Sequence, residues 1–257
     1  MRIDAFLADK GLAKSRSFAK TLIDDGYVKV NGNIVNKPSF NVSVDDNVEV
    51  TGKPYEFVGR GGIKLDAALK AFNINVDGVT AVDIGASTGG FTHCLLINGA
   101  KKVYAVDIGH DQLDASLVKD ERVVNLEGIN ARYLTPDQLG EICDIAVSDI
   151  SFISQTYVIP QIKDILSDNG VYIALIKPQF ECGKSNLGKN GIVKDKKAIY
   201  DSVNKVINCA EHNGLGVVSL IMSPIEGGDG NREFLMLCKK GEKTAVDHKF
   251  VSGVCGL

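Results

Sequence analysis

Residues 83–92 read Asp83-Ile-Gly-Ala-Ser-Thr-Gly-Gly-Phe-Thr92, and this stretch decides the fold. It follows a short apolar segment and precedes a segment with helical spacing, so it joins a strand to a helix. Glycine permits backbone angles that are closed to other residues and lets a ligand approach the chain closely. In a doubly wound sheet, such a turn after the first strand lies at the crevice where ligands bind. The stretch therefore predicts a ligand-binding turn at the start of an α/β domain.

Strand-like and helix-like segments alternate from residue 63 onward. Strands are expected at Thr80–Ile84, Lys102–Asp107, Val123–Leu126, Asp144–Asp149, Val171–Ile176, Val217–Met222 and Phe234–Cys238. Helices are expected within 64–72, 89–99, 111–119, 155–168 and 195–213. This alternation predicts a parallel sheet covered on both faces. The last two strands should pair antiparallel, because the glycine-rich connection 223–233 leaves no room for a helix. The fold class is α/β, a doubly wound, Rossmann-like sheet with an antiparallel last strand.

The details of the loop separate the ligands that it could bind. No lysine follows Gly90, which excludes a P-loop, and Ser87 replaces the second glycine of a dinucleotide motif. Gly-Ala-Ser-Thr-Gly also satisfies the nucleophile motif of hydrolases, but it follows the first strand of the domain rather than a later one. A hydrolase, or a turn that only packs helix against strand, remains the weaker alternative.

An acidic residue at the end of the second strand favours an adenosyl cofactor. Asp107 lies 22 residues after Gly85, the usual distance for a carboxylate that accepts hydrogen bonds from a ribose diol. Asp83, at the start of the loop, favours S-adenosylmethionine, because the amino and sulfonium groups of that cofactor are cationic and attract a carboxylate. The candidate contacts of this cofactor are Asp83, Gly85, Ser87, Thr88, Gly89, Gly90, Asp107 and Asn130.

The first 50 residues form a separate small module. Residues 1–40 carry seven Lys or Arg against four Asp or Glu, a local charge of +3, although the whole chain has a net charge of −3. Two short helices, the second capped by Ser15, precede strands joined by the hairpin turn Asn31-Gly32. The run from Ser15 to Gly32, followed by Lys37-Pro38, resembles the small ribosomal S-four type RNA-binding domain. Phosphate contacts are expected from Arg2, Lys10, Lys14, Arg16 and Lys20.

Residues 51–62 contain four glycines and a proline, so we expect them to form a linker. The linker would separate the small α+β RNA-binding domain, 1–50, from the large domain, 63–257. Arg60 within it is a further candidate for RNA contact. A second basic segment, 178–197, follows Lys177 and holds Lys184 and Lys189. It would clamp RNA beside the site, or it is simply a solvated loop.

Four charged residues stand where an acceptor would meet the cofactor. Asp149 and Lys177 end the fourth and fifth strands, Glu233 opens the last strand, and Lys64 lies at the entry to the domain. The Pro-Pro motif typical of amino-methylating enzymes is absent after Asp149. These positions resemble the Lys-Asp-Lys-Glu set of the FtsJ-like ribose 2′-O-methyltransferases.

Together with the small module, they resemble the TlyA family of ribosomal RNA 2′-O-methyltransferases, also catalogued as hemolysin A. The resemblance covers nearly the whole chain. Its marks are Ser15-Arg16-Ser17, Arg60-Gly61-Gly62-x-Lys64-Leu65, the loop 83–92, Ser148-Asp149-x-Ser151-Phe152, Lys177-Pro178-Gln179-Phe180 and Gly230-Asn231-x-Glu233. It implies methylation of a cytidine ribose in ribosomal RNA, in one or both ribosomal subunits.

The chemistry of the four residues agrees with this expectation. A ribose hydroxyl is a poor nucleophile, and a lysine can accept its proton when a second ammonium lies nearby. We expect Lys177 to be the base, helped by Lys64, with Asp149 and Glu233 orienting both lysines and the ribose.

The remaining features exclude other classes of protein. The six cysteines are scattered without zinc spacing, so no metal is expected. No run of 18 apolar residues and no export signal occurs, so we expect a cytoplasmic protein without membrane contact. The alternatives are a non-catalytic RNA-binding protein and a membrane-active hemolysin.

Overall fold

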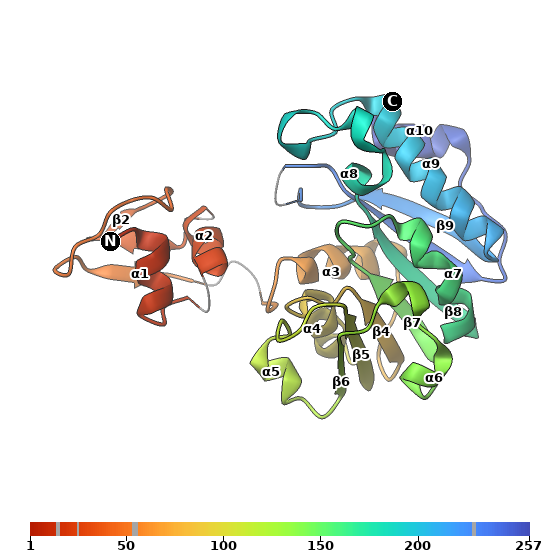
Figure 1. The fold of residues 1–257 in the computed structure, drawn as a ribbon, viewed down its shortest axis with the longest axis horizontal. Coiled ribbons are helices and arrows are strands. Elements are labelled where there is room, and N and C mark those ends of the chain that lie inside the picture. The colour runs from red at the N-terminus through yellow and green to blue at the C-terminus, as the bar shows by residue number, and fades with distance from the viewer. Residues whose placement is uncertain (14–15, 25, 53–55, 228–229) are drawn as a thin grey trace. The chain divides into compact units, whose positions relative to one another are not determined.

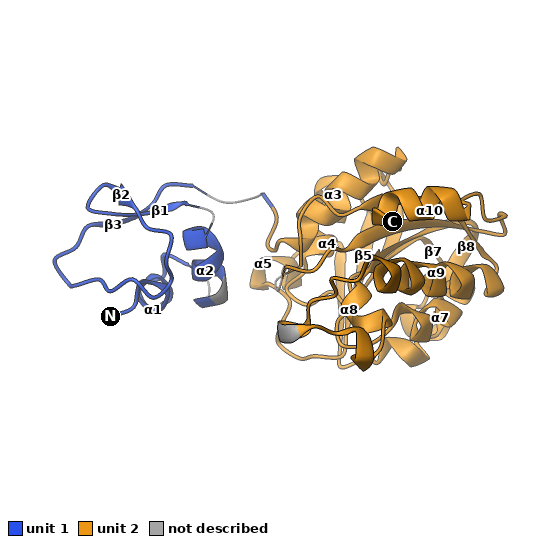
Figure 2. Ribbon diagram, turned by 90° about the horizontal axis from the view of Figure 1, so that it is seen from above, with its two compact units in different colours: residues 1–56 blue, residues 57–257 orange. Residues whose placement is uncertain are grey.

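The computed structural model describes residues 1–257 except 14–15, 25, 53–55 and 228–229. The expected cap Ser15 and the candidate RNA contact Lys14 therefore lie outside the described residues. The chain divides into two compact units, Met1–Glu56 and Phe57–Leu257 (Figure 2). Of the expected linker, the part from Phe57 onward belongs to the larger unit, because the Phe57 ring packs against His93 there.

The smaller unit is an α+β module. Its elements are α1 (Ile3–Asp9), α2 (Arg16–Asp24), β1 (Val28–Val30), β2 (Asn33–Ile34) and β3 (Val48–Val50). The strands form a sheet of order β2-β1-β3 in which every pair is antiparallel. Asn31 and Gly32 both have positive φ, 50° and 81°, as the predicted hairpin turn requires. Ile3, Leu7 and Ile23 are fully buried in the core between helices and sheet.

The larger unit is built on a seven-stranded sheet of order β6-β5-β4-β7-β8-β10-β9 (Figure 1). Its strands are β4 (Thr80–Ile84), β5 (Lys102–Asp107), β6 (Val123–Glu127), β7 (Cys143–Ser148), β8 (Leu166–Ile176), β9 (Leu215–Met222) and β10 (Phe234–Lys240). The β4 to β8 strands pair in parallel, while β10 lies between β8 and β9 and pairs antiparallel with both. The predicted fold class is therefore confirmed.

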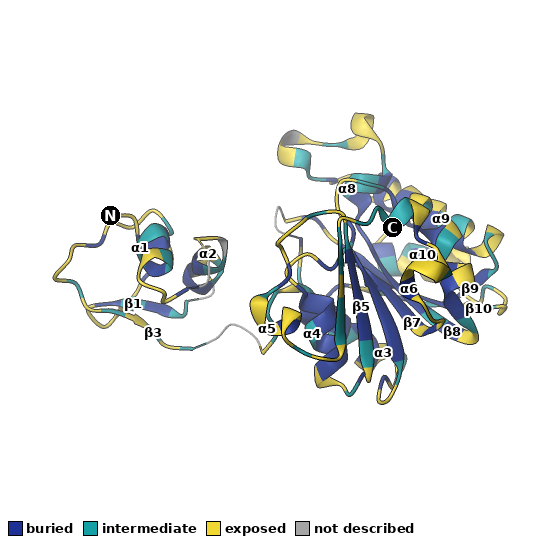
Figure 3. Ribbon diagram, turned by 60° about the horizontal axis from the view of Figure 1, so that its bottom comes forward, coloured by how far each residue is buried: buried dark blue, intermediate teal, exposed yellow. Residues whose placement is uncertain are grey.

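Helices cover both faces of this sheet, whose strands are the most buried part of the unit (Figure 3). They are α3 (Gly61–Phe72), α4 (Gly90–Ile97), α5 (Ala115–Val118), α6 (Pro136–Leu139), α7 (Ile159–Ile165), α8 (Pro178–Glu181), α9 (Lys196–His212) and α10 (His248–Cys255), with the 3-10 turns η1 (Ala131–Tyr133), η2 (Gln155–Tyr157), η3 (Lys184–Asn186) and η4 (Lys189–Gly191). The α3, α4 and α5 helices pack on one face, and α7, α9 and α10 pack on the other. Within the part of the chain that the structure describes, none of the helices has the length and apolar character needed to cross a membrane.

Two of the expected helices are shorter than predicted, and α6, α8 and α10 were not expected. The helix expected within 111–119 covers only Ala115–Val118, because the backbone N–H groups of Asp111, Gln112 and Leu113 donate to the Glu127 carboxylate at 3.0, 2.7 and 3.0 Å instead. These bonds hold the pKa of Glu127 down at about 2. The helix expected within 155–168 ends at Ile165, because the chain enters β8 at Leu166.

Candidate active site

The loop after β4 is held close to the end of β7. Gly85 has a φ of +83°, and a Cβ atom there would lie 2.8 Å from the carbonyl oxygen of Asp149. Glycine is therefore required at this position both for its backbone angle and for the close approach. Ser87 also adopts a positive φ, 47°, which turns the chain toward the start of α4 at Gly90.

Asp83 holds the end of this loop through hydrogen bonds to Thr92. Its side chain is fully buried, and its Oδ2 accepts hydrogen bonds from the backbone N–H and the hydroxyl of Thr92 at 2.8 and 2.7 Å. Its Oδ1 has no hydrogen-bond partner among the described residues. Burial raises the pKa of this carboxyl to about 7. Asp83 thus anchors the first turn of α4, and it does not line the cavities described next.

Two adjoining cavities are lined in part by this loop. The larger, of about 560 Å³, is lined by Asp107, Ile108, Asn130 and Phe152 among others. The smaller, of about 300 Å³, contains the candidate catalytic lysines. Both are lined by the same four residues where they adjoin, namely Gly85, Ser87, Asp149 and Ser151. The larger cavity has the size of an ordinary small-molecule site, about 300–1,000 Å³.

Six of the eight candidate cofactor contacts line one or both of these cavities, and two line neither. Gly85 and Ser87 line both cavities, Thr88 and Gly90 line the smaller one, and Asp107 and Asn130 line the larger one, whereas Asp83 and Gly89 line neither. The Asp107 carboxylate accepts the backbone N–H groups of Ser87 at 2.8 Å and of Gly109 at 2.7 Å. These bonds fix the carboxylate in the lining of the larger cavity. An acid here, apolar side chains beside it and a glycine-rich wall fit an adenosyl group.

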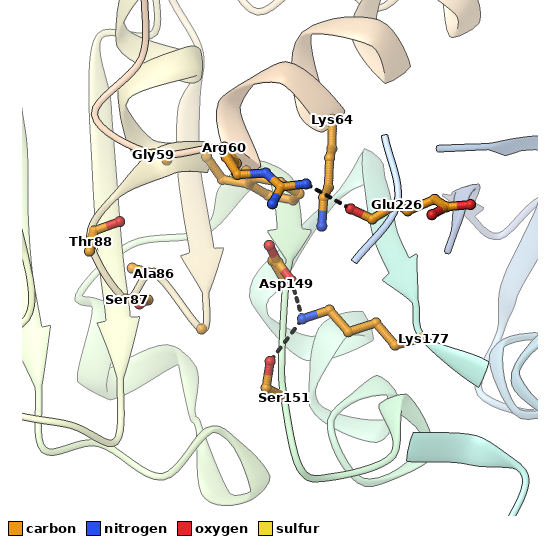
Figure 4. A pocket seen from close by; sticks show the side chains of 14 residues that line it. Gly59, Arg60, Lys64, Ala86, Ser87, Thr88, Asp149, Ser151, Lys177 and Glu226 are labelled. Carbon is orange, nitrogen blue, oxygen red and sulfur yellow. Dashed lines mark hydrogen bonds and ion pairs between the residues drawn. The ribbon is translucent and has the colours of Figure 1, made fainter. Parts of the chain in front are cut away.

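The smaller cavity holds Lys177 between two partners. Its Nζ lies 2.6 Å from Oδ1 of Asp149 and donates to Oγ of Ser151 at 2.8 Å. Lys177 comes from the end of β8, and the two partners come from the segment after β7, the neighbouring strand. Figure 4 shows the three side chains converging. Sequence reasoning gave Ser151 no role, although residues two apart on an extended segment share a face, which could have paired it with Asp149.

A second lysine enters the same cavity from α3. Lys64 is buried, and its Nζ lies 2.5 Å from Oε2 of Glu233, which is itself buried at the start of β10. Arg60, which precedes α3, lines the cavity as well and donates to the backbone carbonyl of Glu226 at 3.0 Å (Figure 4). The four expected catalytic residues therefore form two lysine–carboxylate pairs, with Glu233 just outside the cavity lining.

The expected RNA contacts of the small unit are partly paired within it. Arg2 and Arg16 form ion pairs with Asp4 at 3.0 and 3.2 Å, and the hydrogen bond from Arg2 leads the causes that hold the pKa of Asp4 at about 2. Lys10 lies over the Phe6 ring at 5.9 Å, and Lys20 is exposed. Both arginines remain more than half exposed, so phosphate oxygens can still reach them.

The basic segment after Lys177 is anchored to the rest of the large unit. Lys184 is exposed in η3, while the side chain of Lys189 lies outside the described part of the structure. The buried Asn231 accepts the backbone N–H of Val193 at 2.9 Å and donates to the carbonyl of Gly191 at 3.1 Å. The end of this segment is thereby fixed two residues from Glu233.

Comparisons with known proteins agree with this geometry. The model of the FtsJ-like methyltransferase family matches residues 57–240, and the model of the S4 domain matches residues 1–48. The 16S/23S rRNA (cytidine-2′-O)-methyltransferase TlyA of Mycobacterium tuberculosis is 41% identical over 249 residues, covering 96% of this chain and 93% of its own. Hemolysin A of Brachyspira hyodysenteriae is 41% identical over 240 residues, covering 91% of this chain and 98% of its own.

A solved structure from Streptococcus thermophilus, which carries a hemolysin name, matches the whole architecture. It covers 100% of this chain and 94% of its own, at 38% identity and a TM-score of 0.81. The resemblance seen in the sequence is thus confirmed by family models, by full-length relatives and by fold. The chain belongs to the TlyA/hemolysin A family, which joins an S4 domain to an FtsJ-like methyltransferase domain.

Proposed function

We propose that this protein transfers a methyl group from S-adenosylmethionine to a ribose 2′-hydroxyl of ribosomal RNA, and that the acceptor is a cytidine. The observation that carries the proposal is the Lys177–Asp149 pair, which stands where the smaller cavity adjoins the cofactor loop. The substrate class follows the name of the Mycobacterium tuberculosis relative, a 16S/23S rRNA (cytidine-2′-O)-methyltransferase.

The cofactor would occupy the larger cavity. Asp107 would accept hydrogen bonds from its ribose, Asn130 would lie at its adenine end, and Gly85 and Ser87 would line its passage toward Asp149. When bound, S-adenosylmethionine supplies an electrophilic methyl group. The carboxylate of Asp149 lies at the junction of the cavities, where it favours a positively charged group.

The residues of the smaller cavity would activate the acceptor. Lys177 would accept the proton of the ribose hydroxyl as a neutral amine, which would make the ribose oxygen a better nucleophile. Asp149 and Ser151 hold Nζ of Lys177 in one place, which supplies the orientation that the reaction needs. Lys64, held by Glu233, places a second positive charge beside the oxygen as negative charge develops on it.

Basic residues of both units would contact the RNA. The S4 unit supplies Arg2, Lys10, Arg16 and Lys20, and Lys14 lies within its matched residues. In the large unit, Arg60 lines the smaller cavity, and Lys184 and Lys189 belong to the basic segment that follows Lys177 in the sequence. The expected linker, 51–62, would connect the S4 unit to the methyltransferase unit, although its part from Phe57 onward belongs to the latter.

Transfer of a labelled methyl group to purified 30S and 50S subunits tests the proposal. We expect label in RNA, mapped to a 2′-O-methyl cytidine, and a loss of at least about a hundredfold in Lys177→Ala. Lys163→Ala, which removes an exposed lysine from α7, serves as the matched control and should keep full activity. Full activity of Lys177→Ala would refute the role of the base, and no label in either subunit would refute the substrate.

A further inference from the structure

A buried polar network lies behind the Lys177–Asp149 pair, centred on Gln155. This side chain, in η2, is only 1% exposed. Its Oε1 accepts hydrogen bonds from the Ser148 hydroxyl at 3.1 Å and the Tyr172 hydroxyl at 2.9 Å, and its Nε2 donates to the carbonyl of Leu175 at 2.9 Å. Every polar atom of the Gln155 amide is thus bonded to β7 or β8, the two strands that lead to Asp149 and Lys177.

The chemistry of these partners fixes the orientation of the amide. The Leu175 carbonyl can only accept, so Nε2 must face it and Oε1 must face the two hydroxyls. Ser148 and Tyr172 also approach each other to 2.7 Å. Burial raises the pKa of the Tyr172 phenol far above its ordinary value, so this hydroxyl keeps its proton and remains a donor.

A buried carboxylate completes the network on the other side. Glu181, at the end of α8, accepts the backbone N–H of Gln155 at 2.7 Å and the hydroxyl of Ser154. Lys205 of α9 donates to the Glu181 carbonyl at 3.2 Å and lies 3.4 Å from its Oε2. A carboxylate in the protein interior is costly unless such partners satisfy it, and here each oxygen has one.

The network encloses the two segments that carry the proton-transfer residues. Ser148 and Ser154 stand at either end of the segment that holds Asp149 and Ser151. Leu175 and Glu181 stand on either side of Lys177. Besides the parallel backbone pairing of β7 with β8, Gln155 thus joins the ends of both strands through its side chain, next to Asp149 and Lys177. Displacing a reacting group by about 1 Å can cost about a hundredfold in rate.

We propose that Gln155, Tyr172 and Glu181 are positioning residues, which hold Asp149 and Ser151 against Lys177 through this network. The inference rests on the proposed methyl transfer. Stability alone does not require such a network, because well-packed apolar residues of similar volume often replace buried charged groups without loss of stability. Its position directly behind the reacting pair gives it a role in activity instead.

A matched pair of tyrosine variants separates positioning from stability. Tyr172→Phe and Tyr104→Phe each delete one hydroxyl from a buried tyrosine of the same sheet. Tyr172 bonds to Gln155 and Ser148, while Tyr104 bonds to Glu141 at 2.8 Å, away from both cavities. We expect Tyr172→Phe to lower kcat for ribosomal RNA by about fivefold, and Gln155→Met to lower it by about a hundredfold. Neither should change KM for RNA by more than about threefold, and Tyr104→Phe should leave kcat unchanged.

Equal kcat values for wild type and a folded Gln155→Met, or equal losses in the two tyrosine variants, would overturn the proposal. The conservative Glu181→Gln keeps an acceptor for the Gln155 N–H and should recover more of kcat than Glu181→Leu. Melting temperatures measured on all variants identify any that fail to fold.

A measurement without RNA keeps the inference separate from the proposed function. The rate at which an amine-acylating reagent modifies Lys177, followed by mass spectrometry, reports how firmly Asp149 and Ser151 hold its Nζ, because only the free, unprotonated amine reacts. We expect this rate to rise at least about fivefold in Gln155→Met and to stay constant in Tyr104→Phe. A constant modification rate in Gln155→Met would refute the positioning role of the network, whether or not the wild type is active on ribosomal RNA. An inactive wild type would refute only the proposed function.

Discussion

Lys64 and Glu233 stand 169 positions apart in the sequence, yet their side chains form a buried ion pair of 2.5 Å. The pair forms because β10 is inserted next to β8, which brings Glu233, the residue before β10, to the Lys64 side chain of α3. Leu65 of α3 and Leu235 of β10 share the same hydrophobic cluster, so the apolar packing fixes the distance between the two charges.

Breaking this ion pair should cost more stability than replacing it. Glu233→Leu leaves the Lys64 ammonium buried without a partner and should lower the free energy of unfolding by about 3–5 kcal/mol. The double variant Lys64→Met/Glu233→Leu, with an apolar pair of similar volume, should recover most of that loss in urea titrations. Methyl transfer should stay absent in both. Recovery of activity along with stability would show that the pair only supports the fold.

Gly85 should tolerate alanine far less well than a glycine without neighbours. Gly85→Ala combines a positive φ with a Cβ atom 2.8 Å from the Asp149 carbonyl, whereas Gly140 has a φ of +78° and open space around it. We expect Gly140→Ala to cost about 1–2 kcal/mol and Gly85→Ala more, with methyl transfer impaired only in the latter. Thermal unfolding and the transfer assay check both. Similar losses of stability and activity in the two variants would show that the close approach of Gly85 to the Asp149 carbonyl does not matter.

Removing the acid of the larger cavity should weaken cofactor binding. Asp107→Ala deletes an ionised hydrogen-bond acceptor worth about 1.5–3 kcal/mol, so the Kd for S-adenosylmethionine should rise about tenfold or more in calorimetric titrations. Asp120→Ala, which breaks an ion pair with Arg122 on the surface, is the control and should leave Kd unchanged. An unchanged Kd in Asp107→Ala would move the ribose contact elsewhere.

The raised pKa of Asp83 should make stability depend on pH. Burial raises the pKa to about 7 in the folded state from 3.8, so between these values the folded protein binds a proton that the unfolded chain has lost. The stabilising contribution of the protonated group is present below about pH 4 and is lost as pH rises toward 7. Asp83→Asn should remove this loss, so its advantage over wild type grows from pH 4.5 to 7.5 in urea titrations. A difference that is independent of pH would contradict the expected titration.

Local patterns in the sequence determined the elements and their order. The β4 and β5 strands begin and end where the sequence predicted, because short apolar runs bounded by turns have few alternatives in an α/β domain. The Asn31-Gly32 turn and the antiparallel end of the sheet follow from the same kind of evidence. The α10 helix was not expected, since its eight residues include a serine and a glycine; a capping bond from the Phe250 N–H to Asp247 and the burial of Val251 hold it in place.

Only the tertiary structure decided what each charged residue touches. The sequence predicted a site containing Lys64, Asp149, Lys177 and Glu233, but not that Lys177 pairs with Asp149 and Lys64 with Glu233. It named Asp83 as a candidate cofactor contact, but not that its Oδ2 accepts hydrogen bonds from the backbone N–H and the hydroxyl of Thr92. It gave no sign of the Gln155 network. Residue type and spacing along a chain specify strand and helix periods, whereas the partner of a side chain depends on which strands lie side by side, and that is decided by packing of the whole sheet.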